Sequence, residues 1–323
     1  MIQDGDVSMP SISENRRVWG KEYSWLGQGD EFSWVWGGVE THWHATILPR
    51  IRRFLPAARV LEIGVGQGRW TRFLIDYADE YIGIDLNPEC VSACQARFAG
   101  VDHAKFVAND GMSLTAVADN SVDFVFTFDS LVHVEIDAIE AYLGELSRKL
   151  SPDGVAFIHH SNLGEHQAAL KVGRFLSAAA EKSRLARKIL YRLRLISWEH
   201  WRAPSVTAQK VVDLCAARGL VCVGQEIIDW GHHSRRMIDC ISIVTRLGSK
   251  WQRPNVVVRN PHFMREAMSA YVISEIYTSL GPFEFGSNDK IDAATILGAS
   301  TEKDVKWRRR EAKKMKAVSR ALF

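Results

Sequence analysis

An aspartate and a histidine in the middle of the chain have the types and the spacing needed for acid–base chemistry. Asp129 and His133 follow an apolar run at 122–128 that is typical of a strand covered on both faces. If the loop after this run begins a helical turn, the two side chains share one face at i and i+4. An acid next to a histidine orients the imidazole and raises its basicity. We therefore interpret His133 as a candidate general base that Asp129 orients.

Two further histidines end the next apolar run. His159 and His160 close the run at 155–160, and successive strand residues point to opposite faces, so at most one of them faces a ligand. We expect that one to be His160, as an alternate base or as a hydrogen-bond partner of the substrate. A metal site that uses these histidines with Asp129 is conceivable. No ligand spacing specifies it, however, and we predict no metal.

The most specific motif is a glycine-rich turn in the sequence VLEIGVGQGRW at 60–70, between an apolar strand and a helix expected over 69–77. Glycines let the backbone approach a ligand closely, and the free N–H groups of the helix favour a negative group. The spacing fits neither G-x-G-x-x-G nor a phosphate loop, which needs Gly-Lys-Ser/Thr. Asp85 closes a second strand at 81–85, where its carboxylate could accept hydrogen bonds from ribose hydroxyls.

The turn and the acid after the second strand together resemble the cofactor site of class I S-adenosylmethionine-dependent methyltransferases. The resemblance implies S-adenosyl-L-methionine as cofactor and S-adenosyl-L-homocysteine as product. It also implies that the acid after the third strand, at 105–110, meets the adenine amino group, and Asp110 before Gly111 matches that position. The expected cofactor-binding residues are Glu62, Gly64, Gly66, Gly68, Asp85, Leu86, Asp110, Gly111 and Asp129.

Longer motifs extend this resemblance over about residues 19–246. They are WVWGG at 34–38, NDGMSL at 109–114, FDSLVHVE at 128–135, HHSN at 159–162, HWRA at 200–203 and QEIIDWG at 225–231. They are similar to those of a bacterial methyltransferase subfamily commonly encoded among polysaccharide-biosynthesis enzymes. The resemblance implies a saccharide acceptor, by genomic neighbourhood and not by chemistry. The expected substrate-binding residues are Trp34, Trp36, His159, His160, Trp201 and Arg202.

The resulting hypothesis is an enzyme, an S-adenosylmethionine-dependent O-methyltransferase that acts on a hydroxyl of a glycan or polysaccharide precursor. The sulfonium already activates the methyl group, so the protein has to hold the acceptor oxygen in line and accept its proton. Two alternatives remain open. One is a methyltransferase of a lipid or secondary metabolite, and the other is a non-catalytic protein that binds an adenosine cofactor.

Strand and helix patterns that alternate over 58–248 predict the elements that position these residues. We expect an α/β fold with a Rossmann-like, seven-stranded, mostly parallel sheet and helices on both faces. Residues 18–57 form an aromatic N-terminal lid, although most of its indoles are expected to pack on the core. Residues 1–17 are polar and aperiodic and are predicted to be a disordered leader. A C-terminal accessory extension at 249–302 packs on the sheet edge or on another subunit, which leaves a homo-oligomer open.

Basic residues concentrate in two segments. A helical insertion after the fifth strand, at 165–203, carries a Lys/Arg-rich stretch at 171–194, and the tail at 303–323 has nine Lys/Arg against two acids. The whole chain has a formal net charge of only +3, so its remainder is acidic and we predict no nucleic-acid partner. The basic segments are compatible with an anionic or lipid-linked acceptor or with peripheral membrane contact. Plain solvation of these segments is the alternative.

Cysteine usage and the N-terminus bear on the compartment. The five cysteines show no C-x-x-C spacing and fall in apolar patterns, which predicts buried free thiols in a reducing compartment. The polar N-terminus is unlike a signal peptide, and no apolar run approaches 18 residues. We therefore predict a cytoplasmic protein, with the inner face of the membrane as an alternative location.

Overall fold

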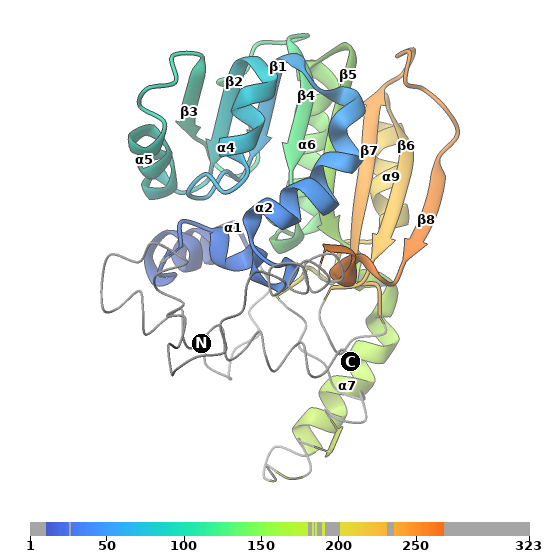
Figure 1. The fold of residues 1–323 in the computed structure, drawn as a ribbon. Coiled ribbons are helices and arrows are strands. Elements are labelled where there is room, and N and C mark those ends of the chain that lie inside the picture. Colours follow the sequence, from blue (N-terminus) through green and yellow to red (C-terminus); the bar gives the residue numbers. More distant parts are fainter. Residues whose placement is uncertain are drawn as a thin grey trace, which may run out of the picture.

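The framework of the protein is one mixed sheet (Figure 1). The computed structural model describes residues 11–25, 27–179, 183, 185, 189–190, 201–230 and 236–267. The strands in these ranges are β1 (Ala57–Ile63), β2 (Ala78–Asp85), β3 (Ala104–Ala108), β4 (Val122–Thr127), β5 (Leu150–Ser161), β6 (Leu220–Ile228), β7 (Asp239–Arg246) and β8 (Val256–Asn260). Their order is β3-β2-β1-β4-β5-β7-β6-β8, and β7 runs antiparallel to both of its neighbours while the other pairs are parallel.

The sheet confirms the predicted α/β, Rossmann-like, mostly parallel fold but has one strand more than the seven expected. The additional strand is β8, which pairs parallel with β6 and lies within the predicted accessory extension at 249–302. Its core is the run Val256–Val257–Val258, and each of these side chains is about half exposed. Three consecutive β-branched residues favour a strand, but the run is too short to predict one reliably. Such short, half-exposed runs are typical of strands at the edge of a sheet.

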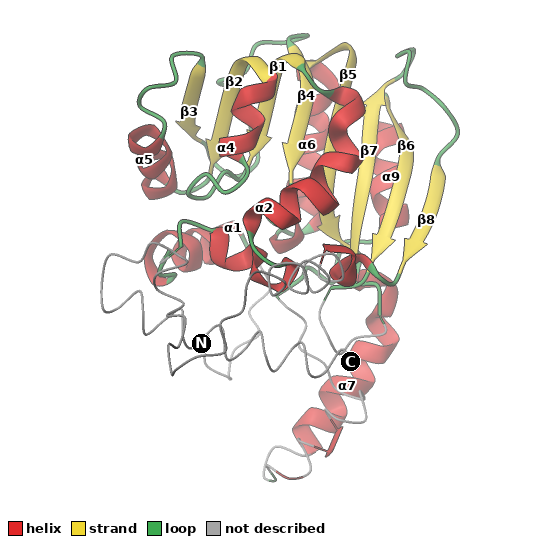
Figure 2. Cartoon of the chain, viewed as in Figure 1, coloured by secondary structure: helices red, strands yellow, loops and turns green. Residues whose placement is uncertain are grey.

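Helices cover both faces of the sheet (Figure 2). They are α1 (Ile12–Arg17), α2 (Val39–His42), α3 (Leu48–Ile51), α4 (Thr71–Leu74), α5 (Pro88–Arg97), α6 (Ile136–Lys149), α7 (Gln167–Ala179) and α9 (Ala208–Ala217), with short 3₁₀ and π turns between some of them. Successive strand residues point to opposite faces. Val60 and Phe124 therefore pack in the core that holds α2 to α5, whereas Leu61 and Val125 pack in the core beneath α6 and α9.

The N-terminal segment is ordered further toward its start than the sequence analysis expects. The predicted disordered leader at 1–17 is wrong for residues 12–17, which form α1, while residues 1–10 lie outside the described ranges. The Ser11 side chain accepts a hydrogen bond from the Glu14 backbone N–H at 3.2 Å and caps the helix. The Ser-x-x-Glu pattern that begins at Ser11 is a known start signal for a helix and could have predicted this one.

The basic insertion and the C-terminal segments are described only in part. A 3₁₀ turn (Leu163–His166) leads from β5 into α7, which projects away from the sheet and exposes Val172 and Phe175 (Figure 1). Most of 180–200, all of 268–302 and the tail at 303–323 lie outside the described residues. No described helix is long and apolar enough to cross a bilayer. All five cysteines are buried free thiols, as predicted.

Candidate active site

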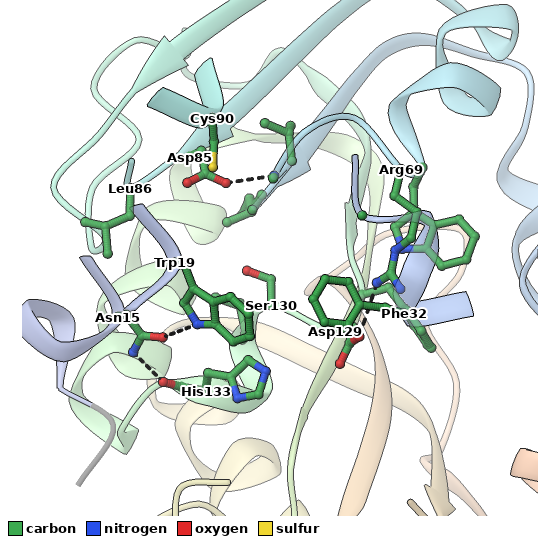
Figure 3. A pocket seen from close by; sticks show the side chains of 18 of the residues that line it. Asn15, Trp19, Phe32, Arg69, Asp85, Leu86, Cys90, Asp129, Ser130 and His133 are labelled. Atoms are coloured by element: carbon green, nitrogen blue, oxygen red, sulfur yellow. Dashed lines mark hydrogen bonds and ion pairs between the residues drawn. The ribbon is translucent and has the colours of Figure 1, made fainter. Parts of the chain in front are cut away.

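A cavity of about 500 Å³ lies where the carboxyl ends of β1, β2 and β4 meet the N-terminal segment. Its floor comes from the glycine turn, the residues after β2 and the loop after β4. Its roof comes from residues between Ile12 and Trp36, which include several of the aromatic side chains of the predicted lid. Figure 3 shows Asp85 and Leu86 at one end, Arg69 and Asp129 at the other, and Ser130 and His133 between them. Ligands of open parallel sheets bind at this edge of the strands.

Two glycines of the turn make room for a ligand at the floor of the cavity. Gly64 and Gly66 line it with φ of +81° and +54°. A Cβ atom on Gly64 would lie 1.9 Å from the hydroxyl of Ser130, so no larger residue fits there. The backbone N–H of Gly66 donates to Asp85 Oδ2 at 2.8 Å, and that of Asn87 donates to Oδ1 at 2.9 Å. The structure thus brings these predicted residues together at the cavity.

Asp85 is the acid at the cofactor end of the cavity. Burial raises the pKa of its carboxyl group to about 6, although the backbone N–H groups that it accepts act in the opposite direction. Because this pKa is still below 7, most of the carboxyl group is ionised at neutral pH. The carboxylate oxygens keep lone pairs that can accept a further hydrogen bond. Asp85 and the neighbouring Leu86 both line the cavity, as expected.

The two outer residues of the glycine motif do not line the cavity. Glu62 is buried beneath the turn, where its carboxyl group accepts hydrogen bonds from the Thr71 and Tyr81 hydroxyls and burial raises its pKa to about 7. Gly68 has a φ of +87°, and a Cβ atom there would lie 2.6 Å from the Phe98 ring. Both residues shape the turn and hold it on the sheet, and neither contacts the cavity directly.

The structure does not bring Asp110 to the cavity, contrary to the expectation that it meets adenine. Its side chain is exposed, and Oδ1 accepts hydrogen bonds from the backbone N–H groups of Met112 and Ser113 at 2.9 and 2.7 Å. These bonds lower the pKa of the carboxyl group. Its neighbours Asn109 and Gly111 line the cavity instead, so the expected position is right within one residue and the side-chain direction is wrong.

His133 lines the cavity in a loop that differs from the expected helical turn. It ends a 3₁₀ turn (Leu131–His133) and is 8% exposed, and its Nδ1 lies 2.9 Å from the backbone oxygen of Trp201. A carbonyl oxygen can only accept, so Nδ1 carries the proton and Nε2 is left as an acceptor. Burial, followed by the charge of Arg202, lowers the pKa of His133 to about 4. The imidazole is therefore neutral at physiological pH.

Asp129 does not orient His133 as expected. Its carboxylate pairs with Arg69, at 3.2 Å from Nη2, and with Arg202, at 3.6 Å. The carbonyl of Trp201 orients His133 instead, and the predicted rise in basicity is wrong because burial dominates. Asp129 adopts a left-handed φ of +61°, which is uncommon for any residue other than glycine and is found mainly where a site fixes the backbone.

A chain of buried ion pairs extends from Asp129 to β7. Arg202 donates from Nε and Nη2 to the two carboxylate oxygens of Asp239 at 3.0 and 2.9 Å, and both side chains are buried. Burial alone would raise the pKa of Asp239, but the charge of Arg202 and hydrogen bonding with His159 outweigh it and hold this pKa well below its usual range. Arg202 lines the cavity, as expected of a substrate-binding residue, and is fixed there by Asp239.

The two histidines that end β5 lie on opposite faces of the sheet, and neither lines the cavity. His160, the expected alternate base, is buried on the α6/α9 face, where Nε2 lies 2.8 Å from Ser242 Oγ and burial lowers its pKa to about 4. His159 lies on the cavity side, where Nδ1 accepts the backbone N–H of Asp129 at 3.1 Å. The choice between the two was therefore wrong, and His159 supports Asp129 from behind.

Aromatic rings form much of the wall around His133. Among the residues expected to bind substrate, Trp36 lines the cavity, whereas Trp34 and Trp201 do not. The ring of Trp19 lies 5.3 Å from the His133 ring, between centroids. Further rings in the wall are those of Trp25, Phe32, Trp70, Phe128 and Trp230.

Several polar residues that line this site were not predicted from the sequence, and Asn15 and Arg69 are the two that fix its geometry. Asn15 donates from Nδ2 to the backbone oxygen of His133 at 2.6 Å and accepts from Trp19 Nε1 at 3.2 Å, so it ties the roof to the loop after β4. Arg69 directly follows the glycine turn, and its guanidinium lies over the rings of Trp70 and Phe32. The only sequence signal for Arg69 is its place at the start of the helix after the turn. In the described ranges no group of three or more His, Cys, Asp or Glu is arranged to hold a metal.

The part of the chain that forms the floor of the cavity matches a known protein family. Residues 60–154 match the family model of a methyltransferase domain. This segment is similar to methyltransferase domains. It runs from β1 into β5 and contains the glycine turn, Asp85 and His133. The predicted enzyme class, an S-adenosylmethionine-dependent methyltransferase, and the predicted cofactor are confirmed at the level of this domain.

Solved structures resemble the fold at low identity, and no curated protein sequence matches the chain. The PH0226 protein from Pyrococcus horikoshii is 18% identical with a TM-score of 0.45, covering 72% of this chain and 96% of that one. A SAM-dependent methyltransferase from Methanosarcina mazei is 16% identical with a TM-score of 0.46, covering 62% and 99%. PKMT2 from Rickettsia typhi, in complex with AdoHcy, is 12% identical with a TM-score of 0.46, covering 65% and 54%. Identities and TM-scores this low do not allow the substrate of this chain to be inferred from these proteins.

Proposed function

We propose that the methyltransferase domain transfers a methyl group from S-adenosylmethionine to a hydroxyl of a saccharide. The observation that carries the proposal is a single cavity that joins the glycine turn and Asp85 to a neutral histidine with a free acceptor nitrogen. The first part suits a nucleoside cofactor, and the second suits a hydroxyl that has to lose its proton.

The residues at the cofactor end fit the nucleoside. Gly64 and Gly66 leave the floor open where a Cβ atom would fill it, and Asp85 is placed to accept hydrogen bonds from the ribose hydroxyls. Ile12 and Leu86 lie close to Gly111 in the lining of the cavity, where they offer apolar surface to a flat base. When bound, the cofactor supplies a methyl group made electrophilic by its sulfonium.

His133 would accept the proton of the acceptor hydroxyl at Nε2. An alcohol oxygen becomes far more acidic as its bond to the methyl carbon forms, so a weak base suffices when proton transfer comes late. Gly64, Gly66 and Asp85 would hold the cofactor so that it could supply the methyl group to this oxygen, while Nε2 of His133 would take the proton. The protein contributes position, because the Trp201 carbonyl and the Asn15 amide hold the loop that carries His133.

The wall near His133 supports a saccharide acceptor. Rings such as those of Trp19, Trp25 and Trp36 offer flat apolar surfaces for the C–H faces of a sugar, and Glu31 and Asp129 offer oxygens for its hydroxyls. The same rings would also pack on an aromatic secondary metabolite, which is the second candidate acceptor. A cavity of about 500 Å³ has to hold the cofactor as well, so only the sugar unit that is methylated enters it.

The test is methyl transfer from trideuteromethyl-labelled cofactor to matched acceptors, read by mass spectrometry. The panel contains neutral and acidic monosaccharides, sugar nucleotides, phenols and primary amines, with the His133→Ala protein as the catalytic control. We expect label on a sugar hydroxyl, and at least about a hundredfold slower labelling with His133→Ala. Label on a phenol or an amine would replace the saccharide proposal with the alternative acceptor. Tight binding of S-adenosylhomocysteine without transfer to any acceptor would favour the non-catalytic alternative.

A further inference from the structure

One wall of the cavity contains hydrogen-bond donors that no acceptor satisfies. Trp36 Nε1, Trp70 Nε1 and Arg69 Nη1 are each buried without a hydrogen-bond partner among the described residues. All three residues line the cavity. Buried donors are nearly always paired in folded proteins, because an unpaired donor has lost its hydrogen bond to water and gained none in return. Three such donors in one wall therefore indicate a missing acceptor.

The three side chains form one continuous cluster, which we call the donor wall. The rings of Trp36 and His42 stack with centroids 3.8 Å apart, and the Trp70 ring lies 4.9 Å from His42. The guanidinium carbon of Arg69 lies 4.6 Å from the centre of the Trp70 ring. The donors are thus gathered around one end of the cavity, and a single ligand group can satisfy more than one of them.

The charge of the donor wall indicates which kind of ligand group would bind there. Arg69 is the only charged member, and the acid that pairs with it, Asp129, is shared with Arg202. The pairing uses Nη2 of Arg69 and leaves Nη1 with its hydrogens unpaired. A carboxylate supplies two acceptor oxygens and a negative charge to such a fork, whereas a neutral hydroxyl supplies neither.

We infer that the donor wall binds a carboxylate, with Arg69 as its principal partner. The ring of Phe32 lies 5.4 Å from the guanidinium carbon on the roof side, so the carboxylate replaces this ring against Arg69 when it binds. The inference rests on the proposed function and deepens it, because the carboxylate belongs either to the amino-acid end of the cofactor or to an acidic sugar that serves as acceptor.

The experiment separates these two sources with matched ligands. Calorimetry compares S-adenosylhomocysteine with 5′-methylthioadenosine, which has the same nucleoside and thioether but no amino-acid end. Glucuronate and glucose are then titrated with and without saturating S-adenosylhomocysteine. The proteins are the wild type, Arg69→Gln, and Trp70→Phe, which keeps an aromatic ring, though a smaller one, and removes the indole N–H. Arg59→Gln is the control for charge, because Arg59 pairs with Glu80 away from the cavity.

A cofactor carboxylate on the donor wall predicts that Arg69→Gln weakens S-adenosylhomocysteine by about tenfold or more and leaves methylthioadenosine unchanged. An acceptor carboxylate predicts instead that the wild type prefers glucuronate to glucose and that Arg69→Gln abolishes the preference. Trp70→Phe should show a smaller loss in the same direction, and because it keeps an aromatic, apolar side chain it serves as the second variant if Arg69→Gln fails to fold. In the wild type, the unpaired indole N–H signals should move downfield in proton NMR on binding.

Two other results have distinct meanings. Arg69→Gln could weaken both nucleosides equally or weaken neither of them. If the wild type also does not prefer glucuronate to glucose, the carboxylate inference is overturned while the proposed function stands. If the wild type binds neither nucleoside, the proposed function fails. The glucuronate titration without nucleoside then decides the carboxylate inference by itself.

Discussion

The two ends of the cavity are built in different ways. The cofactor end comes from two neighbouring strands and the turns that follow them, and its contacts are largely backbone N–H groups and one carboxylate, Asp85. The acceptor end is assembled from the N-terminal roof, the loop after β4 and residues near 202 and 239, which buried ion pairs join across the sequence. A site built from adjacent residues can be read from a sequence. A site built from charged residues that pair across distant parts of the sequence can be recognised only from the fold.

The largest effect should separate catalysis from cofactor binding. We expect His133→Ala to lower kcat by about 10²–10⁴-fold, the range of general acid–base catalysis, because it removes the acceptor nitrogen. Affinity for S-adenosylhomocysteine should stay within a factor of about two, since no described contact joins His133 to the glycine turn. Steady-state kinetics and calorimetry on the same preparation make the comparison. Equal losses in both quantities would show that the two ends of the cavity do not act independently.

The pH profile sharpens the same prediction. Because burial lowers the pKa of His133 to about 4, the imidazole stays neutral above that value and gains a proton only below it. At saturating cofactor, where the titration of the free Asp85 carboxyl, with its pKa of about 6, no longer limits binding, we expect kcat to stay flat from pH 8 to about 5.5 and to fall only as pH approaches 4. A fall centred near the ordinary histidine value, about 6.5, would contradict the burial of this base.

The next effect tests the ion pairs that hold the acceptor end. Asp239→Asn keeps the shape of the side chain but leaves Arg202 buried without its full partner. Breaking a buried pair in this way should lower the free energy of unfolding by about 3–5 kcal/mol, measured by urea denaturation. Glu80→Gln, which breaks the exposed pair with Arg59, is the control and should leave the urea midpoint unchanged. A loss of less than about 1 kcal/mol for Asp239→Asn would mean that packing alone positions Arg202.

The smallest effect concerns the cofactor end. Gly64→Ala should lower the free energy of unfolding by about 1–3 kcal/mol, because the new Cβ meets Ser130 and because φ is +81° there. Adding Ser130→Gly removes the clash and should restore part of the loss, while the cost of the left-handed backbone remains. A double-mutant cycle by urea denaturation measures the two contributions. Identical stabilities for the single and double variants would show that Ser130 does not press on the turn.

Most of the sheet could be predicted because its strands are apolar runs separated by turn residues. Seven of the strands follow this pattern. β8 is a short run at the edge of the sheet whose side chains are all about half exposed, so its sequence shows no alternation between buried and exposed residues. The glycine turn and Asp85 could be predicted because their geometry is local. The start of α1 was missed although its capping residues are visible in the sequence.

Side-chain direction is what the sequence could not supply. His159 and His160 differ by one residue, and one residue places a strand side chain on the opposite face of a sheet. Asp110 was placed correctly along the chain, but it turns to cap its own loop instead of facing the cavity. The partner of His133 is a carbonyl 68 residues away, and no spacing within the loop could have indicated it.

The position of β7 has a consequence for how the protein is made. This strand lies between β5 and β6 although it follows both in the chain, so the sheet has to stay open until the last of the three arrives. Asp239 is its first residue, and Arg202 has no buried countercharge on β7 before then. We therefore expect that the nucleoside end can form before β7 is in place, whereas the acceptor end is complete only once β7 has inserted between β5 and β6.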